Sequence, residues 1–382
     1  MDFSFSEEQR LLRDNIIKFA RGTLNQKVIE RDHNHEFPAD LWRKCGEIGI
    51  QGLPIPEQYG GSNVDPLTCA IALEALGYAC HDGGLVFSLS AHLLACAVPI
   101  WRHGTDAQKQ LYLPGLCDGT LVGSHAITEP GSGSDTFSMR TRAEKVDGGW
   151  KINGTKTFIS NGPVADVAII FAVTDPGKGF HGGVSGFLVE TRQPGLSTGK
   201  PFEKMGLRTS PIGELVFEDM FVPDEAVLGK VGAGAAVFGT AMDWERALLV
   251  SGHVGVIERL LETAVSYART RNQFNQSIGK FQAVSHKIAD MKVQLEAARL
   301  LAYRAAWKLG NSRSASLDAS IGKLFVSESL LKCALDCVQL HGGYGFMVEY
   351  EVERVLRDAV AGTIYSGTSE MQRNIISRWL GL

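Results

Sequence analysis

Residues 284–305 read VSHKIADMKVQLEAARLLAYRA, and the apolar side chains in this stretch recur at alternating spacings of four and three. The positions on this face are Val284, Ile288, Met291, Leu295, Ala298, Ala302 and Ala305. Such a stripe is typical of a helix that packs along its length in a bundle. The preceding stretch repeats the pattern at Val250, Val254, Ile257, Leu261 and Ala264. The sequence therefore predicts a bundle of long helices in this part of the chain.

Two further helices complete the expected bundle. One is predicted near residues 317–340, and another begins within IYSGTSEMQR, residues 364–373. There, Ser369 and Gln372 have the spacing of a capping box, and Gly367 allows a sharp turn before it. A helix start presents free N–H groups that suit an anion or a developing oxyanion.

The whole chain is predicted to be α+β and to contain three domains. Residues 1–117 have helical periodicity and form the N-terminal helical domain, which opens on a capping box at Ser6. Residues 118–228 contain short β-branched and aromatic runs, with a hairpin turn predicted at Asn153-Gly154. We expect a β-barrel or sandwich there. Residues 229–382 then form the C-terminal four-helix bundle.

Composition excludes several classes of function. The chain has 382 residues, 44% of them hydrophobic and 21% charged, with a net charge of −4, as in a soluble globular protein. No basic patch suits nucleic acid or an anionic membrane. The N-terminus, MDFSFSEEQR, does not read as a signal peptide, and the apolar stretch around residues 89–101 is too short to span a bilayer. We expect a cytoplasmic protein.

The seven cysteines are an odd number, and no pair has zinc-ligand spacing. Most lie in apolar, helix-like segments, which is typical of buried thiols in a reducing compartment. We therefore expect no metal site.

Glu245 lies in AMDWERALLVSGHVGV, residues 241–256, where an apolar helix begins. A carboxylate partly buried at such a position has a raised pKa, which suits a general base. A salt bridge among Asp243, Glu245 and Arg246, or simple exposure, is the other interpretation. The residues alone favour this second one.

Two glycine-rich stretches invite a nucleotide-binding interpretation. EPGSGSD (129–135) and VGAGAAVFG (231–239) both lack the third glycine of the dinucleotide fingerprint, so a Rossmann site is not expected. A Gly/Ser loop beside a β domain can still hold a phosphate or flavin through backbone amides. Farther along, Arg269 and Arg271 could bind phosphates, but composition alone favours solvated loop charges.

Six motifs together resemble the acyl-CoA dehydrogenase superfamily of flavoproteins, and they extend over the whole chain. They are AITEPGSGSD (126–135), KTFISNG (156–162), MGLRTSPIGELVFEDMFVP (205–223), YARTRNQFNQSIGKFQ (267–282), QLHGGYGF (339–346) and YSGTSEMQR (365–373). The resemblance implies the same order of helical, β and four-helix domains. It also implies bound FAD and a homotetramer.

The resemblance places FAD contacts in two groups of residues. The flavin ring would be held by Ile127, Thr128, Gly133, Ser134, Phe158 and Ser160, with Thr368 and Glu370 completing the site. The diphosphate and adenosine of a neighbouring subunit's FAD would be reached by Arg271, Gln273, Phe274 and Ile278, with further contacts from Gln339 and Gly343. Asn275 stands where the family usually has glycine, which is a departure at the local turn.

The family's chemistry is the oxidation of the Cα–Cβ bond of a pantetheine thioester. A carboxylate takes the α-proton and a β-hydride passes to flavin N5. The thioester oxygen is stabilised by a flavin hydroxyl and by the backbone N–H at the position of Ser366. Many members carry the base where this chain has Ser366. A minority, similar to isovaleryl- and long-chain acyl-CoA dehydrogenases, carry it on the bundle helix before an arginine. The resemblance thus assigns the base to Glu245, with Arg246 orienting the base or the substrate.

The carrier of the acyl group is indicated by three stretches. They look most similar to prolyl-carrier-protein dehydrogenases of secondary-metabolite biosynthesis, and they are GLVFSLSAHLLACAVPIWRHG (84–104), DPGKGFHGGVSGFLVE (175–190) and IYSGTSEMQ (364–372). We therefore expect an aminoacyl, prolyl-like group on a carrier protein. The alternatives are a short- or branched-chain acyl-CoA dehydrogenase, a flavin monooxygenase on the same fold, and a catalytically silent flavoprotein. The electron acceptor is either an electron-transfer flavoprotein or O2.

Overall fold

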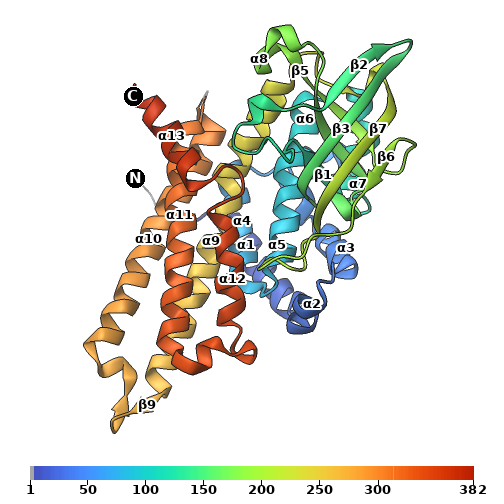
Figure 1. Ribbon diagram of the computed structural model, residues 1–382. Helices are drawn as coiled ribbons and strands as arrows, with labels where there is room; N and C mark the ends of the chain where they lie inside the picture. The colour runs from blue at the N-terminus through green and yellow to red at the C-terminus, as the bar shows by residue number, and fades with distance from the viewer. Residues whose placement is uncertain (1–3, 313) are drawn as a thin grey trace.

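The computed structural model describes residues 4–312 and 314–382, so residues 1–3 of the polar N-terminus lie outside it. A β-sheet stands on one side of the molecule and long helices stand on the other (Figure 1). Helices of the N-terminal region lie between the two and contact both. The fold is therefore the helical, β and helical arrangement that the sequence predicts.

The N-terminal region is built from α1 to α7. These helices span Glu7–Phe19, Val28–Asn34, Ala39–Glu47, Pro66–Ala79, Gly83–Ala91, Val98–His103 and Asp106–Cys117. The capping box at Ser6 is confirmed, since its side chain and that of Gln9 each bond the other's backbone N–H. Asp65 caps α4 by accepting hydrogen bonds from the N–H groups of Leu67 and Thr68.

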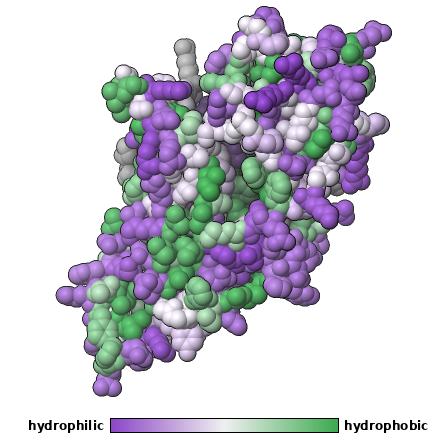
Figure 2. All heavy atoms as spheres, viewed as in Figure 1, coloured by the Kyte–Doolittle hydropathy of each residue, from purple (hydrophilic) through white to green (hydrophobic). Residues whose placement is uncertain are grey.

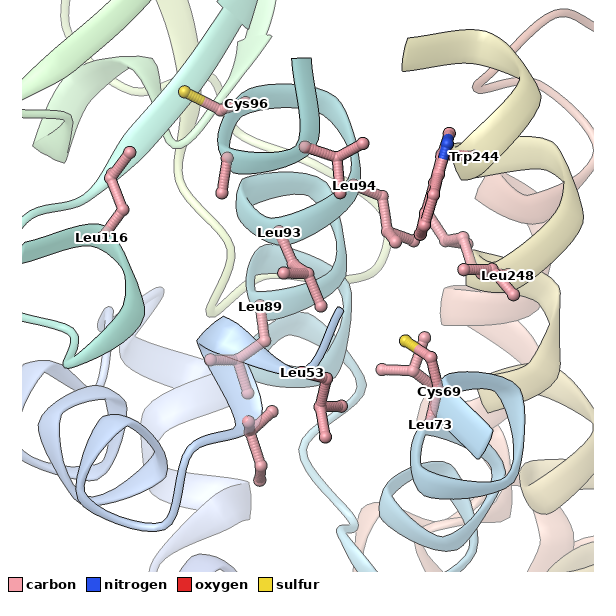
Figure 3. Close-up of a cluster of buried hydrophobic side chains, with 14 of the residues drawn as sticks. Leu53, Cys69, Leu73, Leu89, Leu93, Leu94, Cys96, Leu116, Trp244 and Leu248 are labelled. Atoms are coloured by element: carbon pink, nitrogen blue, oxygen red, sulfur yellow. The ribbon is translucent and has the colours of Figure 1, made fainter. Parts of the chain in front are cut away.

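A continuous helical stretch, Gly83–His103, forms the centre of the main hydrophobic core. The expectation that the apolar stretch around residues 89–101 is too short to span a bilayer is wrong by length, because the helix around it is long and apolar enough among the described residues. It is largely buried inside the fold, as a core helix is. Figure 3 shows Leu89, Leu93 and Leu94 of this stretch among side chains from the neighbouring helices, including Trp244 and Leu248. This packing fixes the position of the helix that carries Glu245.

The strands form one mixed sheet with the order β6-β7-β3-β2-β4-β5-β8, and β1 pairs with β4. β1 to β8 span Gly123–Ala126, Arg142–Val146, Gly149–Ser160, Val167–Val173, Val184–Glu190, Leu196–Thr198, Ile212–Pro223 and Val227–Leu228, and the short helix α8 spans Phe180–Gly183. The alternating burial of β7 places one of its faces on the apolar interior of this domain.

The hairpin turn predicted at Asn153-Gly154 is wrong, because both residues lie inside β3. They form an irregularity in the pairing with β7, where Asn153 Oδ1 accepts a hydrogen bond from the Asp219 N–H at 2.8 Å. The turn into β3 lies instead at Gly148, whose φ is 72°.

The C-terminal region contains α9 to α13, which span Gly234–Thr270, Gln282–Asn311, Ser316–His341, Val352–Gly362 and Ser369–Trp379. The predicted stripe of apolar side chains is confirmed, since Met291, Leu295 and Ala298 on α10 are buried against α9 and α11. Between α9 and α10 the chain makes a small hairpin of β9, Asn272–Gln273, and β10, Gln276–Ser277.

The fourth helix along the bundle is α12, which the sequence analysis did not predict. The helix expected within residues 364–373 forms as α13 and packs on α11. Its N-cap is Thr368 rather than Ser369, since the Thr368 hydroxyl accepts a hydrogen bond from the Met371 N–H at 3.3 Å. The capping box at Ser369 and Gln372 is therefore wrong, because the Gln372 side chain bonds the preceding loop instead.

Candidate active site

Glu245 is buried near the start of α9, with 8% of its surface exposed. Burial raises the pKa of its carboxyl from 4.5 to about 7, while Ser366, Arg246 and Lys323 act in the opposite direction. The Ser366 hydroxyl is close enough to exert this effect, although no hydrogen bond of regular geometry joins the two side chains. A carboxyl with this pKa exchanges protons near neutral pH, as a general base must.

The loop before α13 is held by donors that converge on two carbonyl oxygens. Arg246 Nε donates to the Ser366 oxygen at 2.9 Å, and Lys323 Nζ donates to the Gly367 oxygen at 2.8 Å. Gln372 Nε2 donates to both oxygens, at 3.2 and 2.8 Å. These bonds hold Ser366 at a φ of 54°, a left-handed conformation that is uncommon for a residue other than glycine.

The N–H groups of Ser366 and Gly367 make no hydrogen bond within the described part of the chain. The Gly367 N–H shares a peptide plane with the anchored Ser366 carbonyl, and the bonds to the Ser366 and Gly367 oxygens hold the loop that carries the Ser366 N–H. Preformed backbone donors beside a buried carboxylate are the arrangement that stabilises an oxyanion formed on loss of a proton from carbon. Glu245 and Ser366, which are 121 positions apart in the sequence, are thus brought into one site.

The residue before this loop, Tyr365, borders a small enclosed space. Its hydroxyl lies 2.6 Å from His253 Nε2, and its ring centroid lies 4.7 Å from that of Phe87. Burial lowers the pKa of His253 to about 4, so this imidazole is neutral at neutral pH. These side chains and Leu249, one helical turn after Glu245, line a cavity of about 50 Å³.

The Gly/Ser loop after β1, which carries predicted flavin contacts, is held against the sheet. Lys156 is wholly buried and donates hydrogen bonds to the Ile127 carbonyl oxygen at 3.0 Å and to Glu129 Oε1 at 2.8 Å. The Thr157 N–H donates to the Thr128 carbonyl oxygen at 2.8 Å. The loop bearing Ile127, Thr128, Gly133 and Ser134 is therefore fixed to β3, the strand that carries Phe158 and Ser160.

The backbone of this loop and of β3 suits the approach of a flat ring cofactor. Phe158 has a φ of 56° and leaves 62% of its surface exposed at an irregularity of β3. Gly131 and Gly133 face open space, so the loop backbone can be approached closely. Figure 2 shows the surface hollowed between the long helices and the sheet, with apolar side chains gathered there.

The second predicted group of cofactor contacts lies around the turn between α9 and α10. Arg271, Gln273, Ile278, Gln339 and Gly343 line one pocket of about 500 Å³, and Phe274 beside it is 87% exposed. Asn275, with a φ of 62°, takes the left-handed turn position that glycine would occupy. A cationic side chain suits the phosphates of a nucleotide, and amide side chains with an exposed aromatic ring suit its base.

The second group of predicted contacts lies past the C-terminal end of α9, whereas Glu245 lies in the N-terminal third of that helix. Glu245 and Arg271 are separated by 26 positions (271 − 245), which at about 1.5 Å per residue is about 39 Å along the helix. Thr368 and Glu370 belong to the end that carries Glu245, where Thr368 caps α13 and Glu370 stands in its first turn. The structure therefore does not bring all the predicted residues into one site of a single chain.

Sequence analysis missed Lys323, His253 and the loop-holding role of Gln372. A signal for Lys323 was present, since it is a charged residue within the otherwise apolar and small run SIGKLFV, residues 320–326. A lysine at such a position has either a buried partner or a function.

A buried base beside anchored backbone donors, in a helical, β and helical fold, defines an enzyme that removes a proton from carbon next to a carbonyl. The acyl-CoA dehydrogenase N-terminal, middle and C-terminal domains match residues 6–120, 124–220 and 232–381. The chain belongs to the acyl-CoA dehydrogenase family.

Relatives of two substrate types match at nearly equal identity. An L-prolyl-[peptidyl-carrier protein] dehydrogenase of Pseudomonas fluorescens is 42% identical, over 100% of both chains. A mitochondrial isovaleryl-CoA dehydrogenase of Oryza sativa is 40% identical, over 98% of this chain and 92% of that protein. A solved structure of PigA with FAD and proline has a TM-score of 0.98 and 41% identity, over 100% of both chains. The protein is thus an FAD-dependent acyl-thioester dehydrogenase.

Proposed function

We propose that the protein oxidises the Cα–Cβ bond of an aminoacyl, prolyl-like group that a carrier protein presents as a pantetheine thioester. The observation that carries this proposal is the buried carboxyl of Glu245, with a pKa raised to about 7, beside the free N–H of Ser366. Loss of an α-proton needs both a base and a donor for the thioester oxygen. The identity with the prolyl-carrier-protein relative supports the choice of acyl group.

Each group at the site has a defined part in this reaction. Glu245 takes the α-proton onto its carboxylate, and the Ser366 N–H donates to the thioester oxygen as negative charge develops there. When bound, FAD would supply the acceptor for the hydride that leaves Cβ as the Cα–Cβ double bond forms. Arg246 orients the loop, since its hydrogen bond goes to the Ser366 oxygen.

FAD contacts are proposed for both ends of α9. Ile127, Thr128, Gly133, Ser134, Phe158, Ser160, Thr368 and Glu370 would hold the flavin part, and Arg271, Gln273, Phe274, Ile278, Gln339 and Gly343 would hold the diphosphate and adenosine part. Arg271 lies about 39 Å along α9 from Glu245, so one dinucleotide whose flavin lies beside Glu245 does not reach Arg271 of the same chain. A second copy of the chain must supply the second group, which supports the homotetramer that the family resemblance implies.

The main alternative is an acyl-CoA dehydrogenase for short or branched chains. CoA and carrier proteins present the same pantetheine thioester, and the isovaleryl-CoA relative is almost as similar. A flavin monooxygenase is less well supported, because that reaction gives Glu245 no α-proton to remove. The electron acceptor is either an electron-transfer flavoprotein or O2. We infer a cytoplasmic location, which the buried free thiols of the seven cysteines support.

The assignment of the base is tested by Glu245→Gln, which keeps the size of the side chain and removes its basicity. The variant should bind FAD as the parent does, and substrate should no longer reduce the flavin in the absence of oxygen. Glu258→Gln, the same substitution at a residue of α9 that pairs with Arg299, is the matched control and should retain reduction. Rapid reduction in Glu245→Gln would show that another group is the base.

A further inference from the structure

Lys323 on α11 is wholly buried, yet it has no salt-bridge partner within 4.0 Å among the described residues. Its one hydrogen bond goes from Nζ to the Gly367 carbonyl oxygen at 2.8 Å. A buried ammonium without a close counter-ion is costly for the fold. A buried lysine at this position therefore suggests that the side chain has a function in the adjoining site.

Lys323 donates its hydrogen bond to the loop from a different helix than the two other donors do. Arg246 reaches it from α9 and Gln372 from α13, whereas Lys323 reaches it from α11. Ser366 needs such support, because it holds a left-handed backbone with a φ of 54°. Without the donor from α11, the Gly367 oxygen would keep only the Gln372 amide.

Charged groups on three helices act on the Lys323 ammonium. Glu245 and Arg246 lie on α9, Glu328 on α11 itself and Glu370 on α13. The pKa of Lys323 is lowered to about 8, because burial and the charge of Arg246 together outweigh the three carboxylates, which raise it. The side chain is therefore charged at neutral pH. Its charge in turn lowers the pKa of Glu245, and that of His253 on α9.

We propose that Lys323 is a positioning residue of the dehydrogenase reaction: it holds the Ser366–Gly367 loop in the conformation that aims the Ser366 N–H, and its charge keeps the facing Glu245 ionised. This inference rests on the proposed role of Glu245 as the base. It adds that Lys323 on α11 acts on both parts of the site: on the base, Glu245, and on the loop that carries the Ser366 N–H.

Three variants separate the hydrogen bond from the charge. Lys323→Met removes both, Lys323→Gln removes the charge and keeps a donor, and Gln372→Met removes a neutral donor to the same carbonyls. In the FAD-loaded enzyme, kcat of Lys323→Met should fall about 10- to 100-fold, less than the roughly 100- to 1000-fold loss that follows removal of an oxyanion donor itself. The acid limb of its kcat/KM profile should move up by about one pH unit, because a facing positive charge is lost.

The other two variants should differ from this result in opposite ways. Lys323→Gln should recover most of kcat above pH 8 while its acid limb stays displaced. Gln372→Met should lower kcat and leave the limb in place. Hydrogen–deuterium exchange should be faster for residues 364–368 in Lys323→Met than in Lys323→Gln. If Lys323→Met fails to retain FAD, the displaced limb of Lys323→Gln decides the question.

The proposal would be overturned if the acid limb of the kcat/KM profile stayed in place in both Lys323 variants and hydrogen–deuterium exchange of the loop were unchanged. Failure of the base assignment would look different. In that case the acid limb would persist in Glu245→Gln, whatever the Lys323 variants do.

Discussion

Arg246 donates a hydrogen bond from Nε to the Ser366 carbonyl oxygen at 2.9 Å, so the residue after the proposed base holds the loop with the proposed oxyanion donor. Burial lowers the pKa of this guanidinium, and Asp243 and Glu245 act to raise it. Because Glu245 and Arg246 are adjacent on α9, base and loop are tied to the same turn of one helix. A displacement of that turn would disturb both parts of the site together.

The rate of substrate oxidation should rise with pH through the pKa of Glu245. Only the ionised carboxylate can accept the α-proton, and burial raises its pKa to about 7. We expect kcat/KM to fall about tenfold for each pH unit below 7, and to level off above it. A stopped-flow profile of flavin reduction measures this, and a flat profile between pH 5 and 8 would exclude a base with a raised pKa.

Glu245 should make the fold less stable at high pH. Its folded pKa of about 7 lies above the ordinary value of 4.5, so its protonated form is favoured by folding. This contribution is complete below the unfolded pKa and is lost as the pH rises through 7. Glu245→Gln should therefore raise the free energy of unfolding at pH 8 by about 1–3 kcal/mol, and change little at pH 4.5. Denaturant unfolding of the apoprotein at both pH values checks this, and equal effects at the two would refute it.

The contact between α4 and α9 should tolerate no side chain at Gly255. A Cβ there would overlap the carbonyl oxygen of Glu74 on α4. We expect Gly255→Ala to destabilise the fold by at least about 1–3 kcal/mol, because backbone must shift. Gly239, on the same helix, has nothing within 4 Å of an added Cβ. Gly239→Ala should instead stabilise by about 0.5–1 kcal/mol. Similar thermal midpoints for the two variants would contradict the close approach of the helices.

Arg271 should contribute to FAD retention although it is far from Glu245. It lines the pocket of about 500 Å³ at the distal end of α9, whereas the exposed Arg269 does not. We expect Arg271→Ala to raise the Kd for FAD about 10-fold or more, because a charge-assisted contact to phosphate is lost. Arg269→Ala should bind FAD normally. Flavin absorbance after gel filtration compares them, and equal retention would count against a distal contact.

The sequence was sufficient for the order of domains and for the bundle seam, because the apolar positions recur regularly over long helices. It was insufficient where a local sequence pattern is compatible with two different structures. Asn153-Gly154 has the composition of a turn but forms an irregularity inside β3. Gln372 has the spacing of a capping partner but bonds carbonyl oxygens of the preceding loop.

The site was predictable only in part. The resemblance located Glu245, but its burial depends on the packing of α9 against the rest of the chain, which no local pattern reveals. α12 was missed although Val352, Val355, Leu356 and Ala359 have helical spacing. Lys323 was missed because its partner, the Gly367 carbonyl oxygen, belongs to the backbone and is 44 positions away.

The central claim is tested most directly by an anaerobic titration of the FAD-loaded protein, followed by the visible flavin spectrum. One series receives prolyl and related aminoacyl groups on a carrier protein, and the other receives short and branched acyl-CoAs. The proposed function predicts that the carrier-bound aminoacyl series alone bleaches the flavin, and that Glu245→Gln prevents the bleaching. Bleaching by the acyl-CoAs, with none from the carrier-bound series, would contradict the carrier-protein assignment and make the protein an acyl-CoA dehydrogenase.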